Sequence, residues 1–232
     1  MDNVLQVKDL NVSFKSYLGT IRAVRGVNFV LNEKETLAMV GESGCGKTVT
    51  AKSILKLFGR TSGNISPQSQ ILFDGQDILK MSKNELSDLR GAKISMIFQD
   101  SMTSLNPTMR VGKQIAECIR LHNKVSREEA MKRACDLLRL VEIPNPEERL
   151  KNYPHQMSGG MRQRVMIAMA LSCNPKILIA DEPTTALDVT IQAQLIDLLK
   201  GLREKMGMSV ILVTHDLGVV ADFADRIQVM YA

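Results

Sequence analysis

One segment of the sequence has the residue types and spacing needed to hold a phosphate. It reads Gly41-Glu42-Ser43-Gly44-Cys45-Gly46-Lys47-Thr48, which matches G-x-x-x-x-G-K-[ST], and it follows an apolar run that ends at Val40. Glycines let backbone N–H groups converge on phosphate oxygens, and the start of a helix adds a positive dipole end. We expect Lys47 to reach the β- and γ-phosphates of a nucleotide and the Thr48 hydroxyl to ligate Mg²⁺. The alternative is a glycine-rich turn between a strand and a helix.

A pair of acidic residues suits the chemistry of a metal-bound nucleotide. Asp181 and Glu182 directly follow the apolar run 177–180, so they are expected at the carboxyl edge of a sheet, where ligands of α/β proteins bind. Asp181 is predicted to hold Mg²⁺, usually through water, and Glu182 to polarise the attacking water. Without the glycine-rich segment, a turn that ends a strand would be an equally good interpretation.

His215 comes just after the apolar run 210–213 and is therefore expected at the same kind of edge. There it could donate a hydrogen bond to a γ-phosphate or to the attacking water. A lone histidine in a turn is more often a bystander, and position alone does not decide between the two.

Ser158-Gly159-Gly160 forms a second candidate anion cradle. Ser158 can cap a helix that runs to the Asn174-Pro175 stop, and the two glycines leave backbone N–H groups open to a phosphate. A capped helix without a ligand is the alternative.

The elements around these residues predict an α/β fold. The runs 4–14 and 23–31, with an Asp74-Gly75 turn further on, indicate antiparallel strands at the start of the chain. The later runs 37–40, 177–180 and 210–213 are apolar on both faces, as in a parallel sheet covered by helices.

Three helices are also predicted: 51–58 up to Gly59, 126–141 with Ser126 and Glu129 in capping-box spacing, and 191–206 before Gly207. Between Gln99 and Ser158 no strong strand pattern occurs, which indicates an inserted helical lobe.

Composition is that of a globular protein, with 44% hydrophobic and 24% charged residues and a net charge of +5 without a basic run. Cys45, Cys118, Cys135 and Cys173 are widely spaced and are interpreted as reduced thiols. The N-terminus lacks a basic region followed by an apolar stretch, as in a signal peptide, and no segment approaches the ~18 apolar residues needed to cross a bilayer. We therefore expect a cytosolic protein that acts on a membrane only through a partner.

Taken together in chain order, these motifs resemble the ATP-binding cassette (ABC) family. Ser158-Gly159-Gly160 with Met161 is similar to the family's LSGGQ signature, with Met157 in place of Leu and Met161 in place of Gln. Gln99 matches the Q-loop, Asp181 and Glu182 match Walker B, Ala186-Leu187-Asp188 matches the D-loop, and Thr214-His215-Asp216 matches the switch histidine.

The resemblance implies a P-loop NTPase core with a mainly parallel sheet, an antiparallel β-subdomain and an inserted α-helical subdomain. The core and β-subdomain are placed at residues 1–98 and 175–232, and the helical subdomain at about 100–174.

The resemblance also implies the site residues. Glu182, His215 and Gln99 are expected to be catalytic, and Thr48, Gln99 and Asp181 to bind Mg²⁺. Residues expected to contact ATP are Gly41, Ser43, Gly44, Cys45, Gly46, Lys47, Thr48, Val49, Ser158, Gly159, Gly160 and Asp188. An aromatic residue near the N-terminus is expected to stack on adenine, with Phe14 preferred over Tyr17; core or surface packing is the alternative for either residue.

The partners follow from the resemblance as well. The signature cradle of one copy would close on the γ-phosphate held by Lys47 of a second copy or of a sister ATPase. Two membrane permease subunits and, indirectly, an extracytoplasmic binding protein are implied, at the cytoplasmic face of a membrane and without nucleic acid.

Within the family, the segments 99–107 and 153–157 are similar in sequence to those of the bacterial oligopeptide, dipeptide and nickel importers. Members of that group continue for several dozen residues beyond the equivalent of Tyr231, so the sequence is interpreted as a truncated nucleotide-binding domain.

A soluble cassette ATPase acting on nucleic acid or the ribosome is an alternative, although neither sustained heptads nor duplication is present. A non-catalytic regulator is disfavoured because Glu182 and His215 are both retained.

Overall fold

The computed structural model describes residues 3–17, 19–58, 63–99, 104–185 and 187–231, which form two compact units. The first unit comprises residues 1–87 and 208–232, and the second comprises residues 88–207. The division near residues 98 and 175 that the sequence predicts stays a prediction.

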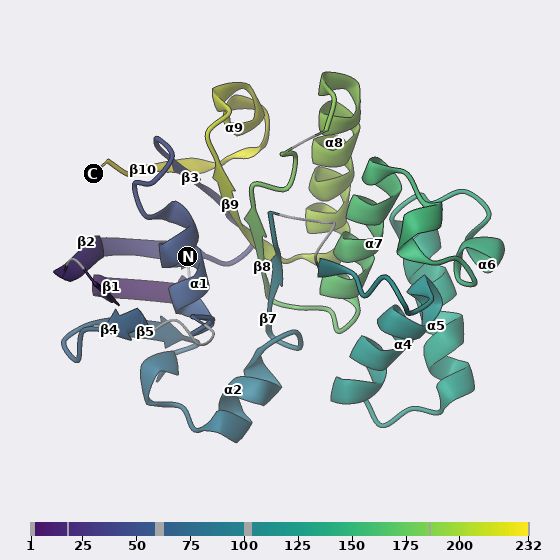
Figure 1. The fold of residues 1–232 in the computed structure, drawn as a ribbon, viewed down its shortest axis with the longest axis horizontal. Helices are drawn as coiled ribbons and strands as arrows, with labels where there is room; N and C mark the ends of the chain where they lie inside the picture. The colour runs from purple at the N-terminus through teal and green to yellow at the C-terminus, as the bar shows by residue number, and fades with distance from the viewer. Residues whose placement is uncertain (1–2, 18, 59–62, 100–103, 186, 232) are drawn as a thin grey trace. The chain divides into compact units, whose positions relative to one another are not determined.

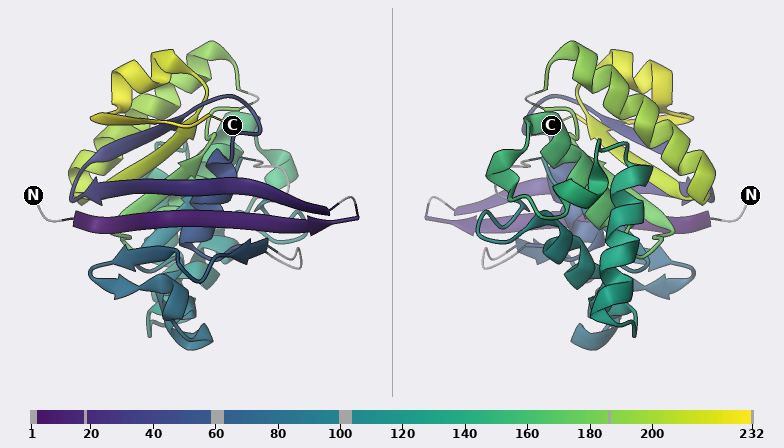
Figure 2. Two further views of the ribbon diagram at one scale, coloured as in Figure 1. Left: turned by 90° about the vertical axis from the view of Figure 1, so that its left-hand side faces the viewer. Right: turned by 90° about the vertical axis from the view of Figure 1, so that its right-hand side faces the viewer.

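An antiparallel sheet occupies the N-terminal part of the first unit. Strands β1 (Asn3–Ser16) and β2 (Gly19–Asn32) pair with Leu5 opposite Leu31, and Figure 2 shows them side by side as a long ribbon. On the other side of β1 lie β4 (Gly63–Ile65) and β5 (Gln70–Phe73), and β6 (Gln76–Asp77) pairs with β5. The predicted antiparallel start of the chain is confirmed.

The backbone of the turn between β5 and β6 explains why Asp74 and Gly75 occupy it. Asp74 has φ +46° and Gly75 has φ +79°. Two successive positive φ values define the tight turn whose twist matches that of a hairpin, and Asp and Gly tolerate them best. The predicted turn is therefore confirmed.

The first unit also contributes three parallel strands in the order β10-β3-β9. These are β3 (Thr36–Val40), β9 (Ser209–Thr214) and β10 (Arg226–Val229), and every residue of β3 and β9 is buried. Helix α9 (Leu217–Phe223) packs on β3, with Val220 against Ala38 and Val40. Figure 1 shows β10 beside β3. Burial on both faces explains the continuous apolar pattern.

Helix α1 (Lys47–Ile54) is shorter than the sequence predicts. The apolar spacing predicted a helix to Phe58, which is wrong for its last turn because Lys56 adopts φ +51°, outside the right-handed helical region. The predicted stop at Gly59 lies outside the described residues.

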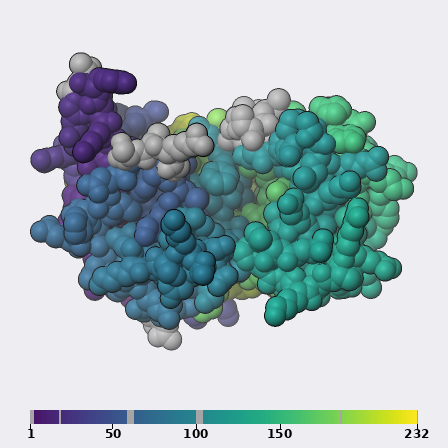
Figure 3. Space-filling model, turned by 60° about the horizontal axis from the view of Figure 1, so that its bottom comes forward, coloured from purple at the N-terminus to yellow at the C-terminus, as the bar shows by residue number. Residues whose placement is uncertain are grey.

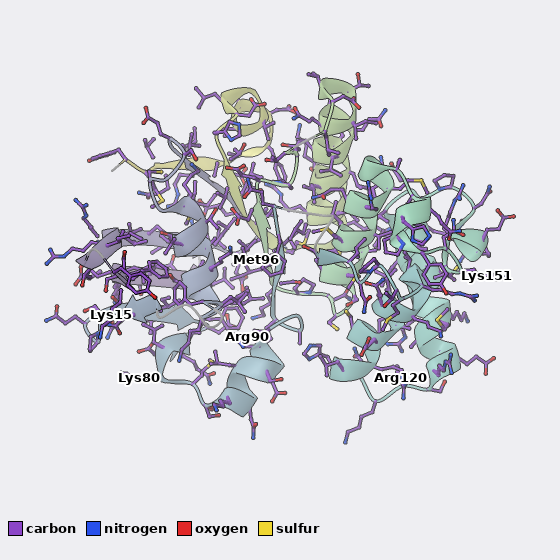
Figure 4. The ribbon with its side chains drawn as sticks, viewed as in Figure 1. Lys15, Lys80, Arg90, Met96, Arg120 and Lys151 are labelled. Atoms are coloured by element: carbon purple, nitrogen blue, oxygen red, sulfur yellow. The ribbon has the colours of Figure 1, made fainter. Side chains whose placement is uncertain are left out.

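The second unit combines two parallel strands with most of the helices. Strands β7 (Ile94–Ile97) and β8 (Ile177–Asp181) are fully buried, and Figure 4 labels Met96 on β7. The helices are α4 (Val111–His122), α5 (Arg127–Leu140), α6 (Pro146–Arg149), α7 (Gly159–Leu171) and α8 (Val189–Met206). In Figure 3 helices α4 and α5 lie within the teal part of the surface. In the described part of residues 99–158 no strand occurs, as expected.

Local capping groups set the ends of these helices. Ser126 Oγ accepts from Glu129 N at 3.1 Å to begin α5, and Gly207, with φ +64°, ends α8. Both ends were predicted from the sequence. The shorter elements include 3₁₀ turns at Ile78–Lys80 and Pro154–Gln156 and helix α2 at Lys83–Leu89.

Across the described ranges, no helix combines the length and the apolar character required to cross a membrane.

Candidate functional site

The glycine-rich segment lies between β3 and α1, as its motif requires. The backbone reverses through Gly44 (φ +88°) and Gly46 (φ +95°), values that disfavour any residue with a Cβ. Gly46 also approaches β2 so closely that a Cβ would lie 2.5 Å from the carbonyl oxygen of Ala23. The sequence therefore needs glycine at these positions to bring backbone N–H groups to the start of α1.

Lys47, the first residue of α1, is buried and folds back over this turn. Its Nζ donates to the carbonyl oxygens of Gly41 at 2.6 Å and Glu42 at 2.8 Å, and it is only 5% exposed. Among the described residues no carboxylate forms an ion pair with this ammonium group. A buried cation held by neutral carbonyls at a helix N-terminus favours the binding of an anion, which is the fit expected for a nucleotide phosphate.

The predicted histidine follows β9 in the same unit. His215 is exposed, and its neighbours fix the chain on both sides of it. Asp216 N donates to Thr214 Oγ1 at 3.1 Å, and Asp216 Oδ1 caps α9 by accepting from Gly218 N at 2.8 Å. The imidazole is thus presented at the carboxyl end of a buried strand, as predicted.

The two candidate adenine-stacking residues differ in their surroundings. Phe14 lies in β1 opposite Ile21 and packs edge to face against Phe58 with ring centroids 5.8 Å apart. It shares a strand face with Val12 two residues earlier. Tyr17 is fully exposed in the turn that follows β1.

In the second unit, Asp181 ends β8 and Glu182 begins the next turn. Asp181 is 1% exposed, whereas Glu182 is half-buried and has φ +47°. This positive φ is uncommon for a residue with a side chain, and such residues concentrate at functional sites.

Two donors meet on the Glu182 carboxylate. Gln99 Nε2 donates to Glu182 Oε2 at 2.8 Å, and Thr185 Oγ1 donates to the same oxygen at 2.9 Å. The predicted Gln99 and Glu182 are thus brought together. Thr185 was not predicted; its position three residues after Glu182, at the end of a possible turn, was the only signal.

The signature and D-loop residues also lie together in the second unit. Ser158 Oγ accepts from Met161 N at 3.3 Å and caps α7, while Asp188 Oδ1 accepts from Ile191 N at 2.9 Å and caps α8. Added Cβ atoms at Gly159 and Gly160 would lie 3.9 Å from Leu187 and 3.1 Å from Ile191. The two helix starts are therefore neighbours. Ala186 of the predicted D-loop lies outside the described residues.

The donors predicted for Mg²⁺ are a hydroxyl, an amide and a carboxylate from Thr48, Gln99 and Asp181. Oxygen ligands of this kind suit Mg²⁺. Thr48 lies in the first unit and the other two lie in the second. Within the described ranges no cluster of three or more His, Cys, Asp or Glu is arranged to hold a metal.

The four cysteines are free thiols. Burial, with a smaller effect of neighbouring Cys173, raises the pKa of the Cys118 thiol to about 11. Cys45 is buried within the glycine-rich turn, with its Sγ 3.9 Å from Lys47 Nζ.

Two features define the P-loop NTPase class. A buried parallel strand leads through a glycine turn to a lysine that starts a helix, and a second buried strand ends at Asp181 and is followed by Glu182. The chain belongs to the ABC transporter family, whose model matches residues 24–185. Both the fold and the family predicted from the sequence are confirmed.

Two curated relatives match nearly the whole chain. The oligopeptide transport ATP-binding protein OppD of Bacillus subtilis is 59% identical over 99% of this chain and 64% of its own length. The dipeptide transport ATP-binding protein DppD of the same species is 58% identical over 100% of this chain and 69% of its own length. The chain thus spans about two thirds of each of these proteins.

A solved structure has the same fold. It is a dimeric, post-hydrolysis state of the ATP-binding cassette MJ0796 bound to ADP and Pi, with a TM-score of 0.84 and 31% identity, over 97% of this chain and 94% of that one.

Proposed function

We propose that this chain binds and hydrolyses ATP as the motor subunit of an importer for peptides or a related small solute. The observation that carries the proposal is the buried Lys47 ammonium group, held by carbonyls inside a glycine turn at the start of α1. The names of the two transport relatives support the importer role. They give no support to the alternative of a cassette acting on nucleic acid.

In this proposal Lys47 releases the carbonyls of Gly41 and Glu42 and donates to the β- and γ-phosphates. Backbone N–H groups of residues 43–49 surround the phosphates at the positive end of α1. The Thr48 hydroxyl, the Asp181 carboxylate and the Gln99 side chain would hold Mg²⁺, which when bound would supply positive charge beside the phosphates.

Glu182 accepts a proton from the attacking water, and His215 donates a hydrogen bond to the γ-phosphate or to that water. In phosphoryl transfer the protein contributes mainly the positioning of the reacting groups and the stabilisation of charge. The hydrogen bonds that hold Glu182 supply this positioning, as do the bond from Asp216 N to Thr214 Oγ1 across His215 and the Asp216 cap of α9.

We assign adenine stacking to Phe14 rather than Tyr17. Phe14 shares a strand face with Val12, whose β2 partner Val24 lies 3.4 Å from a Cβ placed on Gly46. This pairing puts Phe14 on the face of the sheet that the glycine turn covers. Stacking on a bare aromatic ring gives little base selectivity, so other purine triphosphates should bind too.

The active species is a head-to-tail dimer of two copies or of this chain and a sister ATPase. The exposed Ser158 hydroxyl and the N–H groups that begin α7 form a second anion cradle, and Asp188 lies beside it. The dimeric state of the MJ0796 cassette supports this assembly. Opening and closing of this dimer would act on two permease subunits at the cytoplasmic face of a membrane. An extracytoplasmic binding protein would be coupled to the dimer through these permeases.

The test uses Glu182→Gln and the parent protein. We expect the variant to bind MgATP with an affinity within about threefold of the parent, to form a dimer in sedimentation experiments, and to lose more than about 100-fold in hydrolysis rate. Full residual hydrolysis would remove Glu182 from the role of base. Failure of both proteins to bind ATP would overturn the proposal as a whole.

A further inference from the structure

Glu182 is held at two points by a residue three positions further along the chain. Thr185 Oγ1 donates to Glu182 Oε2 at 2.9 Å, and Thr185 N donates to the carbonyl oxygen of Glu182 at 3.2 Å. One threonine therefore restrains both the side chain and the main chain of the proposed base.

The second of these bonds closes a four-residue turn, Glu182 to Thr185. Pro183 occupies its second position, where a fixed φ favours the turn. Glu182 itself has φ +47°, so its backbone is in a region that a residue with a Cβ rarely adopts. The turn thus maintains an unusual direction for the Glu182 side chain, and Thr185 closes it.

Gln99 and Thr185, which both donate to Glu182 Oε2, come from different parts of the chain. Gln99 comes from the segment after β7, 83 residues earlier in the chain, whereas Thr185 belongs to the same turn as Glu182. A rearrangement of the Gln99 segment would break its bond, but the Thr185 bond moves together with Glu182. Thr185 is therefore the donor that can stay in place through a catalytic cycle.

The neighbouring threonine has a different role. Thr184 is buried, and its carbonyl oxygen accepts from Leu187 N and Gln192 Nε2, which ties the turn to α8. The Thr185 side chain is exposed, so a substitution there removes a hydroxyl group without opening a cavity in the core.

We infer that Thr185 is a positioning residue for ATP hydrolysis, and that its hydroxyl group orients the Glu182 carboxylate toward the attacking water. The inference rests on the proposed function. It requires the hydroxyl group and not merely a side chain of this size, which separates it from a structural role of the turn.

The experiment compares steady-state ATP hydrolysis of Thr185→Val, Thr185→Ser and Thr190→Val. Valine keeps the shape of threonine without the donor, serine keeps the donor, and Thr190 is an exposed threonine in α8 that serves as the control. For Thr185→Val we expect kcat to fall about 10-fold to 100-fold with KM within about twofold, because misplaced catalytic groups cost rate more than binding. Thr185→Ser should restore kcat to within about threefold, and Thr190→Val should match the parent.

A parent-like kcat in Thr185→Val would overturn the inference, and so would a serine variant as slow as the valine variant. Glu182→Gln measured alongside separates this failure from that of the proposed function. If Glu182→Gln is inactive while Thr185→Val is normal, only the role of Thr185 is wrong. If Glu182→Gln hydrolyses ATP normally, the assignment of the base itself is wrong.

Discussion

Gln99 Nε2 lies 2.8 Å from Glu182 Oε2, so a side chain expected to bind Mg²⁺ donates directly to the side chain expected to polarise the attacking water. Both residues belong to the unit of residues 88–207. This contact links two motifs that are 83 residues apart in the sequence.

The contact predicts an order of activity for two variants. Gln99→Ala removes a donor from Glu182, and Gln99→Glu places a second carboxylate beside it, which is electrostatically unfavourable. We expect kcat for ATP hydrolysis to fall from parent to Gln99→Ala to Gln99→Glu, with the last at least about 10-fold below the parent. A Gln99→Glu variant as active as the parent would show that the contact has no catalytic role.

Lys47→Ala should weaken nucleotide binding without unfolding the protein. The substitution removes a buried ammonium group whose hydrogen bonds are to neutral carbonyls, and alanine is a good helix former at the start of α1. We expect the Kd for ATP, measured by calorimetry, to rise about 10-fold or more. Lys52→Ala, on the same helix, is the control and should bind as the parent does; unchanged affinity in Lys47→Ala would refute the phosphate cradle.

Gly159→Ala tests the second cradle separately from folding. Among the described residues, a Cβ at Gly159 would meet Leu187 Cδ2 at 3.9 Å, an ordinary contact, so the variant should keep the parent melting temperature. The added methyl group would stand where a phosphate is expected, and hydrolysis should fall about 10-fold. Gly201→Ala in α8, with nothing within 4 Å of its new Cβ, should instead gain about 0.5–1 kcal/mol of stability at parent activity. Parent-like hydrolysis in Gly159→Ala would count against the cradle.

Cys118 should react slowly with maleimide in the native protein. Burial raises the pKa of its thiol from 9.0 to about 11, and the thiolate is the reactive form. Mass spectrometry of labelled peptides should show the Cys118 rate rising about tenfold per pH unit between pH 7 and 9, and a much faster rate in urea. Equal rates in native and unfolded protein would contradict the burial of this thiol.

The same shift has a consequence for stability. A thiol whose pKa is raised in the folded state contributes stability that is complete below the unfolded value of 9.0 and is lost as pH rises toward about 11. Cys118→Ala should therefore flatten the decline of the melting temperature between these two pH values.

Features encoded by neighbouring residues could be predicted from the sequence. The glycine turn before Lys47, the Asp74-Gly75 hairpin and the Ser126 cap each depend on a few adjacent residues, and the structure has all of them. Local chemistry determines local geometry in these cases.

Features that depend on distant partners could not be predicted. Strand β7 is short and gains its stability by pairing with Ile177–Ala180, and β10 is defined by its pairing with β3. The Gln99–Glu182 hydrogen bond joins two loops, and no pattern of spacing reveals it. The last turn of α1 was overestimated because apolar spacing continues past the point where Lys56 leaves the helical region.

The central claim is that Lys47 of one copy and the Ser158-Gly159 cradle of another hold the same triphosphate. The most direct measurement is a structure of Glu182→Gln with MgATP, since this variant should retain the nucleotide unhydrolysed. We predict a head-to-tail dimer in which Lys47 Nζ contacts the β- and γ-phosphates and the start of α7 from the partner contacts the γ-phosphate. A nucleotide bound elsewhere on the surface, or a Lys47 side chain still bonded to Gly41 and Glu42 and turned away from the phosphates, would contradict the account.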